Sequence, residues 1–156
     1  MVPADPDARP AWSGAWETGI ARGWWGADGW AGPQAGQLVG GGFVRVRREE
    51  GARPHFVANG QGGFQVRCPR TGAPVVEGFG SALTAWRDGG PRRLDCPACG
   101  EVHDLARLDF RPPAAFAWGV LHLADVGAAH LEEEAEAALS AVLGPIRVIA
   151  RRVPRG

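Results

Sequence analysis

Alternation of apolar and polar positions predicts short strands along much of the chain. Within residues 38–49, Val44 and Val46 alternate with aromatic or charged neighbours, which is typical of a half-buried strand. Within residues 115–124, Leu121 falls on one face and His122 on the other. The same reasoning predicts further strands over residues 54–58, 63–67, 101–109 and 146–152.

Two helices interrupt this series of strands. Ser81 is a favourable N-cap, so a short helix is expected from there to the glycines at 89–90. A second helix is predicted over residues 130–143, where apolar residues recur at helical spacing and three glutamates occupy the first turn. With the strands on either side, this helix forms a β-α-β unit, whose two strands lie parallel if they share a sheet.

These elements predict an α+β protein with mostly antiparallel strands, divided into three segments. Residues 1–37 are rich in glycine and tryptophan and are expected to form an irregular N-terminal arm with a disordered lead-in. Residues 38–111 carry the central strands. Residues 112–156 carry the β-α-β unit, which is expected to pack on the same core, and the prolines at 112–113 mark the boundary.

Two short motifs carry the clearest chemistry. Residues 96–100 read Cys-Pro-Ala-Cys-Gly, so Cys96 and Cys99 have the spacing that directs two thiolates to one metal ion. Residues 68–72 repeat the motif as Cys-Pro-Arg-Thr-Gly, with Thr71 in place of the second cysteine. The pair therefore supplies three thiolates, from Cys68, Cys96 and Cys99, where a complete pair of such motifs supplies four.

The fourth ligand position is open to more than one candidate. His103, His55 or a water molecule can complete a tetrahedral site, and His103 makes a Cys-x-x-Cys-x-x-x-His spacing with the intact motif. His103 lies on an expected strand, however, which would carry it away from the cysteines. The sequence thus leaves two alternatives, a zinc site completed by His103 and a motif pair that keeps its fold without an ion.

The two motifs resemble the metal-binding knuckles of zinc-ribbon and rubredoxin-like proteins. They also resemble an uncharacterised bacterial family with paired Cys-Pro-x-Cys-Gly knuckles around a Trp-bearing helix. The resemblance covers only the knuckles and the residues between them. It implies a degenerate zinc ribbon within residues 38–111 and zinc as the cofactor, but no particular activity.

Charge and composition narrow the classes of partner. Seventeen basic and seventeen acidic residues cancel, which disfavours nucleic acid despite arginine clusters such as Arg45, Arg47 and Arg48. The apolar stretch at residues 113–126 is too short to span a bilayer, and the first residues do not form a secretory signal. Three cysteines with this spacing suit metal binding in a reducing compartment, so a cytoplasmic location without a membrane partner is expected.

The sequence favours a non-enzymatic protein-interaction or regulatory module, whose partner is another protein or a second copy of the chain. Its contact surface would be the strand edges or the tryptophan-rich arm with Trp24, Trp25 and Trp30, although these indoles can equally fill grooves of the fold. A nucleic-acid-binding zinc ribbon is the alternative. An enzyme with an open zinc site or a redox Cys-x-x-Cys comes third, because the zinc-deaminase signature is missing.

Overall fold

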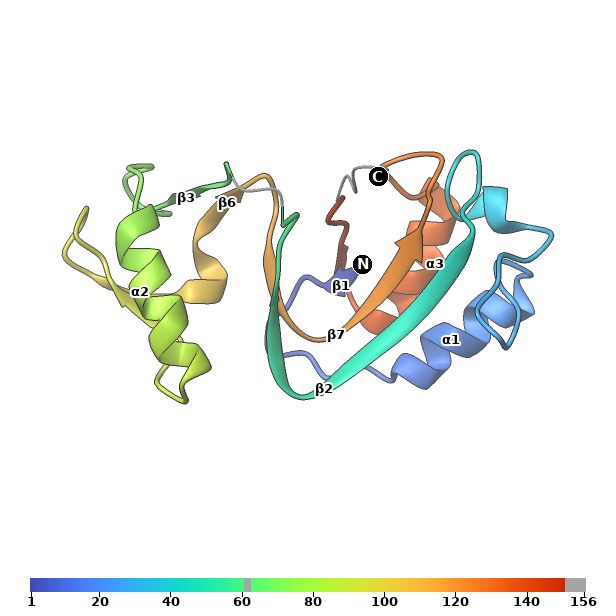
Figure 1. Ribbon diagram of the computed structural model, residues 1–156, viewed down its shortest axis with the longest axis horizontal. Helices are drawn as coiled ribbons and strands as arrows, with labels where there is room; N and C mark the ends of the chain where they lie inside the picture. Colours follow the sequence, from blue (N-terminus) through green and yellow to red (C-terminus); the bar gives the residue numbers. More distant parts are fainter. Residues whose placement is uncertain (61–62, 151–156) are drawn as a thin grey trace. The chain divides into compact units, whose positions relative to one another are not determined.

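The computed structural model describes residues 1–60 and 63–150, which form two compact units (Figure 1). Unit 1 contains residues 1–57 and 115–150, and unit 2 contains residues 58–114. Three α-helices and eight strands in small antiparallel sheets make the described part of the chain an α+β protein, as predicted. No helix in the described ranges is long and apolar enough to cross a membrane.

The longest ladder of unit 1 joins β2 (Arg45–Val57) to β7 (Ala115–Ala124). The two strands run antiparallel in a register that pairs Arg45 with Ala124, and the register shifts between Glu50 and His55. The predicted strands at 38–49 and 54–58 are therefore one strand that begins later and contains an irregularity. Gly51 and Pro54 lie at this irregularity, and proline cannot donate to a regular ladder.

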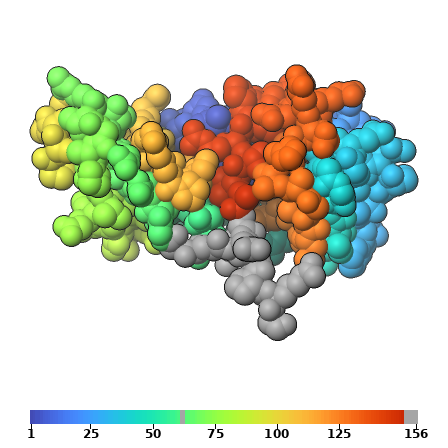
Figure 2. Space-filling view, turned by 90° about the horizontal axis from the view of Figure 1, so that it is seen from above, coloured from blue at the N-terminus to red at the C-terminus, as the bar shows by residue number. Residues whose placement is uncertain are grey.

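The first residues of the chain form a strand instead of the disordered lead-in that was expected. Strand β1 (Val2–Pro3) pairs antiparallel with β8 (Ile146–Arg147), and Figure 2 shows the dark-blue first residues beside the red C-terminal segment. Met1 exchanges two main-chain hydrogen bonds with Leu121 of β7, at 2.6 and 3.0 Å. Burial of Val2 in the core explains why this short segment is ordered.

The predicted β-α-β unit is present, with one strand inserted between its two strands. Helix α3 (Glu133–Leu143) connects β7 to β8. A residue pair that exchanges both main-chain bonds is antiparallel, so β1 runs antiparallel to β7 as well as to β8. Strands β7 and β8 are consequently parallel to each other, with β1 between them. The predicted last strand extended to residue 152, and residues 151–152 lie outside the described part.

Residues 1–37 contain regular structure that the sequence did not predict. Helix α1 (Trp12–Ala21) packs against α3, and a short 3₁₀ helix, η1 (Ala35–Gln37), follows it. The sequence did not predict α1 because the segment contains glycines at 14 and 19, and glycine normally destabilises a helix. Gly19 is required by packing: a methyl group there would overlap the indole of Trp25. The expected irregular arm is therefore partly a helix that contributes to the core.

The core of unit 1 lies between its helices and one face of the β2–β7 ladder. Leu121 of β7, Val46 of β2 and Leu139 of α3 are each at most 2% exposed. On the other face of the ladder, Val120 packs with Val2 in a separate small cluster. The predicted alternation is confirmed at Val120 and Leu121, which lie on opposite faces. Earlier in β7, Ala115 and Ala117 pack in the same cluster as Val120, so the alternation of faces shifts between residues 117 and 120.

The described residues of unit 2 form two small two-stranded sheets, one α-helix and a 3₁₀ helix. Strand β3 (Gln65–Arg67) pairs with β6 (Asp109–Arg111), and β4 (Arg93–Asp95) pairs with β5 (Val102–Asp104). Helix α2 (Val76–Arg87) begins before Ser81, the predicted N-cap. Phe79 of α2 meets Phe110 of β6 edge-on, with ring centroids 5.3 Å apart, and this contact lies at the core of the unit.

A 3₁₀ helix divides the strand predicted over residues 101–109. This helix, η2 (Leu105–Arg107), separates β5 from β6 because the Asp104 carboxylate accepts a hydrogen bond from the amide of Ala106 at 2.9 Å and caps its first turn. The predicted segment 38–111 is likewise distributed over both units, because β2 pairs with β7. The compact units thus differ from the segments drawn from the sequence.

Two glycine-to-alanine substitutions should change stability in opposite directions. Gly19→Ala is expected to lower the free energy of unfolding by about 1–3 kcal/mol, because the methyl group overlaps the Trp25 ring. Gly80→Ala in α2 is the matched control; it has open space around it and should raise stability by about 0.5–1 kcal/mol. Urea denaturation followed by circular dichroism measures both. Equal effects of the two variants would contradict the proposed packing of Gly19 against Trp25.

Candidate metal centre

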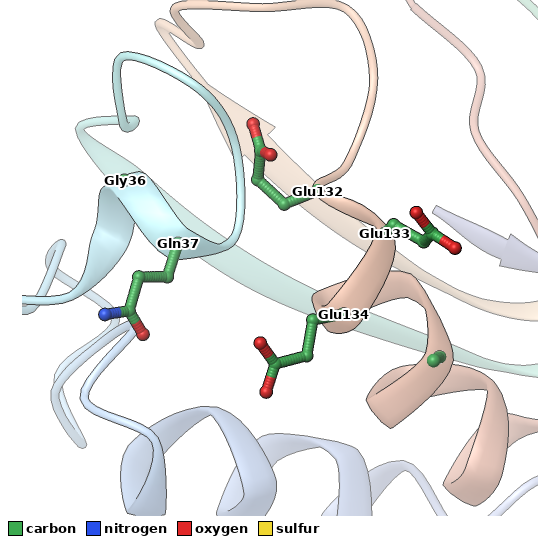
Figure 3. A pocket seen from close by; sticks show the side chains of 6 residues that line it. Gly36, Gln37, Glu132, Glu133 and Glu134 are labelled. Carbon is green, nitrogen blue, oxygen red and sulfur yellow. The ribbon is translucent and has the colours of Figure 1, made fainter.

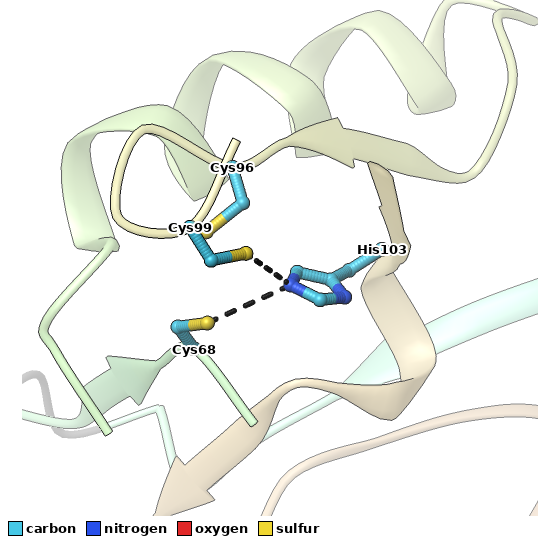
Figure 4. Close-up of side chains that lie close together, drawn as sticks. All are labelled: Cys68, Cys96, Cys99 and His103. Carbon is cyan, nitrogen blue, oxygen red and sulfur yellow. Dashed lines mark hydrogen bonds between the residues drawn. The ribbon is translucent and has the colours of Figure 1, made fainter. Parts of the chain in front are cut away.

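Four side chains of unit 2 converge on one point (Figure 4). The sulfur atoms of Cys68, Cys96 and Cys99 and a ring nitrogen of His103 all lie within 4.8 Å of one another. His103 Nε2 is 3.1 Å from Cys99 Sγ and 3.6 Å from Cys68 Sγ. In tetrahedral zinc sites the usual bond lengths place ligand atoms about 3.5–3.8 Å apart. The cluster therefore has the size and the donor set of a four-ligand metal site.

Both knuckles have the same backbone conformation, although only one carries two cysteines. The amide of Gly100 donates to the carbonyl of Cys96 at 2.9 Å, and the amide of Gly72 donates to the carbonyl of Cys68 at 2.8 Å. In each knuckle the cysteine amide also donates to the residue after the glycine, at 2.9 Å. The glycines have φ of +74° and +71°, a region that favours glycine. Threonine at position 71 is therefore compatible with the same turn that the second knuckle forms with Cys99.

Thr71 holds the position that corresponds to Cys99 and serves the thiolate of its own knuckle. Its hydroxyl forms a hydrogen bond with the sulfur of Cys68 and accepts one from the amide of Ala73 at 3.3 Å. The backbone amides of Thr71 and Arg70 also donate to the Cys68 sulfur. Thr71 is thus a hydrogen-bond partner of a candidate ligand rather than a ligand itself.

His103 reaches the cysteines because the chain reverses at the second knuckle. After Gly100, β5 returns along β4, and His103 lies opposite Leu94 in their ladder. The concern that an extended strand would carry His103 away is therefore unfounded, since this strand runs back past the knuckle. His55, the other candidate, belongs to β2 in unit 1 and is not part of the cluster.

Two ion pairs support the segments that bear the ligands. Arg92, immediately before β4, forms a bidentate ion pair with Asp104, with nitrogen–oxygen distances of 2.8 and 2.9 Å. Asp104 is the neighbour of His103, so this pair fixes the strand that carries the imidazole. Arg70 of the first knuckle also pairs with Glu101 behind the second, which links the two knuckles. No motif in the sequence pointed to either pair.

The thiols of Cys68 and Cys99 differ in acidity because their surroundings differ. The hydrogen bond from the Thr71 hydroxyl, aided by backbone amides, lowers the pKa of Cys68 to about 5. Burial and the neighbouring thiols raise the pKa of Cys99 to about 11. Without a metal, neighbouring sulfurs thus oppose the ionisation of Cys99. A divalent cation reverses this, because its charge favours thiolate at every ligand position.

The three tryptophans predicted as binding residues all belong to unit 1, but they differ in exposure to solvent. Trp24 and Trp25 are 2% and 1% exposed and belong to the core, and Trp25 Nε1 donates to the carbonyl of Trp16 at 3.2 Å. Neither offers an indole to a ligand in this conformation. Trp30 is 51% exposed and lies beneath the guanidinium of Arg45, 5.3 Å from it. The alternative raised from the sequence, that indoles fill grooves of the fold, therefore applies to Trp24 and Trp25.

A hollow of about 660 Å³ opens at the start of α3 in unit 1 (Figure 3). Gly36 and Gln37 form one side, and three exposed glutamates, Glu132, Glu133 and Glu134, form the other. The glutamates occupy the N-terminus of α3, where negative charge stabilises the helix dipole. Their placement is explained by helix stability, and the hollow does not indicate a ligand.

Comparison of the chain with protein-family models, with curated proteins and with solved structures finds no match. The resemblance to zinc ribbons accordingly remains a prediction from the two knuckle motifs. Metal binding is inferred from the ligand atoms themselves, whose positions agree with the candidates Cys68, Cys96, Cys99 and His103.

Removing the Thr71 hydroxyl should alter the titration of the metal-free protein. In the parent chain, one thiol is expected to ionise near pH 5, namely Cys68. Thr71→Val keeps the side-chain shape but loses the hydrogen bond to sulfur, so the pKa of Cys68 should rise. Thiolate absorbance in the ultraviolet, followed against pH, measures this change. Thr71→Ser retains a hydroxyl and should titrate like the parent; an unchanged titration in Thr71→Val would contradict the role given to Thr71.

Proposed function

We propose that Cys68, Cys96, Cys99 and His103 bind one Zn²⁺ as a structural site, and that unit 2 is a zinc-ribbon scaffold in a non-enzymatic protein-interaction module. The observation that carries this proposal is the convergence of four ligand atoms within 4.8 Å. The ligands come from three places in the chain: the end of β3, the knuckle after β4, and β5. A bound ion would therefore tie these segments together.

The donor set favours zinc over other common ions. Thiolate and imidazole are the ligands that zinc prefers, and hard cations such as Mg²⁺ and Ca²⁺ prefer oxygen. Four protein ligands fill a tetrahedral shell, which is typical of structural zinc, whereas catalytic zinc keeps one position for water or substrate. The His103 position therefore favours a structural role over the open-site enzyme considered from the sequence.

The size of unit 2 is consistent with a need for metal. It spans residues 58–114, and domains of this size are marginal without an additional cross-link. Zinc contributes about 10–16 kcal/mol to folding in small zinc-finger peptides, which is ample to stabilise such a unit. The buried aromatic pair of Phe79 and Phe110 supplies a second, metal-independent contribution.

Surface features support the interaction role over nucleic-acid binding. Several arginines that would have to bind phosphate are already paired with acids. Arg92 binds Asp104, and Arg48 of unit 1 lies 3.0 Å from Glu50.

Metal content tests the site directly. The purified chain is expected to carry about one zinc per molecule by elemental analysis. Cys96→Ser should lose the metal, and His103→Ala should bind it more weakly than the parent chain, because three thiolates remain. His130→Ala is the matched control, since His130 is exposed and lies outside the cluster. A metal-free parent chain that also fails to take up added Zn²⁺ would refute the proposal.

Removing zinc should loosen one unit only. Amide hydrogen exchange measured with and without a chelator is expected to show faster exchange in residues 63–114, because the ligands of unit 2 lose their cross-link. Exchange in residues 1–57 and 115–150 should stay unchanged, which provides an internal control. Equal loosening of both units, or of neither, would argue against a structural ion in unit 2.

A further inference from the structure

One edge of β2 is largely unpaired. Strand β7 occupies one edge along its length, and the other edge is covered only where β2 begins. There the amide of Val46 donates to the carbonyl of Gly29 at 2.8 Å, and the amide of Ala31 donates to the carbonyl of Val44 at 3.1 Å. Among the described residues, these are the last main-chain hydrogen bonds on this edge, and β2 continues beyond them.

The next amides on this edge lack a main-chain partner. Amide direction alternates along a strand, so Arg48 and Glu50 direct their backbone groups to the same side as Val46. Among residues 1–60 and 63–150, no main-chain hydrogen bond reaches either of them from that side. The side chains of residues 47–50 are all exposed. This stretch of β2 is therefore available to another strand.

The order of charges on the edge suits a second copy of the same strand. Residues 47–50 read Arg-Arg-Glu-Glu. Charged side chains on an edge ordinarily discourage pairing, because random partners leave like charges opposed. In an antiparallel pair of identical strands, however, a basic side chain of one copy can lie opposite an acidic side chain of the other. Arg48 and Glu50, two positions apart on the same edge, can meet in this way.

The direction of the amides restricts the register of such a pair. Opposite residues in an antiparallel ladder both point into the interface or both point away, so a two-fold axis must pass through a residue. An axis at Glu49 places Arg48 opposite Glu50 of the second copy, twice by symmetry. Within one copy Arg48 already lies 3.0 Å from Glu50, so the four side chains would form one group of alternating charge across the axis. An axis at Arg48 would place the Arg48 side chains of the two copies opposite each other. It would also pair Glu50 with Val46 of the second copy, whose amide already donates to the carbonyl of Gly29. An axis at Glu50 opposes two glutamates in the bonded position.

We propose that two copies of this chain associate through antiparallel pairing of β2 with β2 about an axis at Glu49, held by reciprocal Arg48–Glu50 pairs. The interface is isologous, as in most two-fold dimers. It would join the two β2–β7 ladders into one continuous sheet. The surface lies in unit 1, so this inference is independent of the metal site proposed for unit 2.

Glu49 meets its own counterpart across the axis, on the face opposite to Arg48. Its charge is already offset within each copy. Arg47 lies 3.6 Å from the Glu49 carboxylate, and His122 Nε2 lies 3.0 Å from it. The short contact between the two glutamates is therefore flanked by basic groups, and the Arg48–Glu50 pairs determine the register.

Charge reversal and restoration test the pairing in the full-length chain. Sedimentation velocity over a range of concentrations is expected to show a monomer–dimer equilibrium. Arg48→Glu and Glu50→Arg should each weaken it by about tenfold or more, because both symmetric pairs become repulsive. The double variant Arg48→Glu/Glu50→Arg restores opposite charges and should recover the dimer. Arg93→Glu, an equal charge change on exposed β4, is the matched control and should behave like the parent.

Amide hydrogen exchange supplies a readout that does not depend on these substitutions. The backbone amides of Arg48 and Glu50 should exchange more slowly as protein concentration rises, since pairing covers them. A chain that stays monomeric at every concentration overturns the proposal. A dimer that survives both single reversals, or that leaves the exchange of these two amides unchanged, overturns it as well.

Discussion

The cluster of three cysteines and His103 depends on two tight turns whose glycines have positive φ, Gly72 and Gly100. Each turn folds the backbone around one buried cysteine, Cys68 or Cys96. The first turn also directs amides toward the sulfur of Cys68. The second turn also reverses the chain, which brings His103 back to the thiols. A side chain at either glycine would be strained, and the ligand atoms would then separate. The donor set, the acidity of Cys68 and the proposed zinc site all follow from these two turns.

The first knuckle, which has Thr71 where the second has Cys99, keeps the same backbone turn with only one cysteine. The knuckle retains both of its main-chain hydrogen bonds, because they depend on Gly72 and on the backbone rather than on the missing cysteine. The hydroxyl then stabilises the charge of the one remaining thiolate. His103 places a fourth candidate donor beside the thiols from a different element, β5. Four candidate donors are therefore present although one knuckle has a single cysteine.

Local sequence accounted for the elements whose periodicity is strong. The alternation in β7 and the helical spacing in α3 gave both elements close to their observed bounds. Helix α1 was missed because glycines at 14 and 19 contradict helix propensity, and only the contact with Trp25 explains Gly19. Strand β1 was missed because a two-residue strand has no period of its own. Strand β1 is ordered because its residues pair with β8 on one side and Met1 bonds to β7 on the other.

The sequence by itself determined the α+β class, three candidate thiol ligands and His103 as a candidate fourth, because spacing within a knuckle is a local property. Only the tertiary structure decided that His103 meets Cys68, since their distance depends on the β4–β5 hairpin and on the packing of β3. It also decided that Trp24 and Trp25 are core residues. Contacts between residues far apart in the chain depend on how elements pack, and no local pattern of residue types encodes that packing.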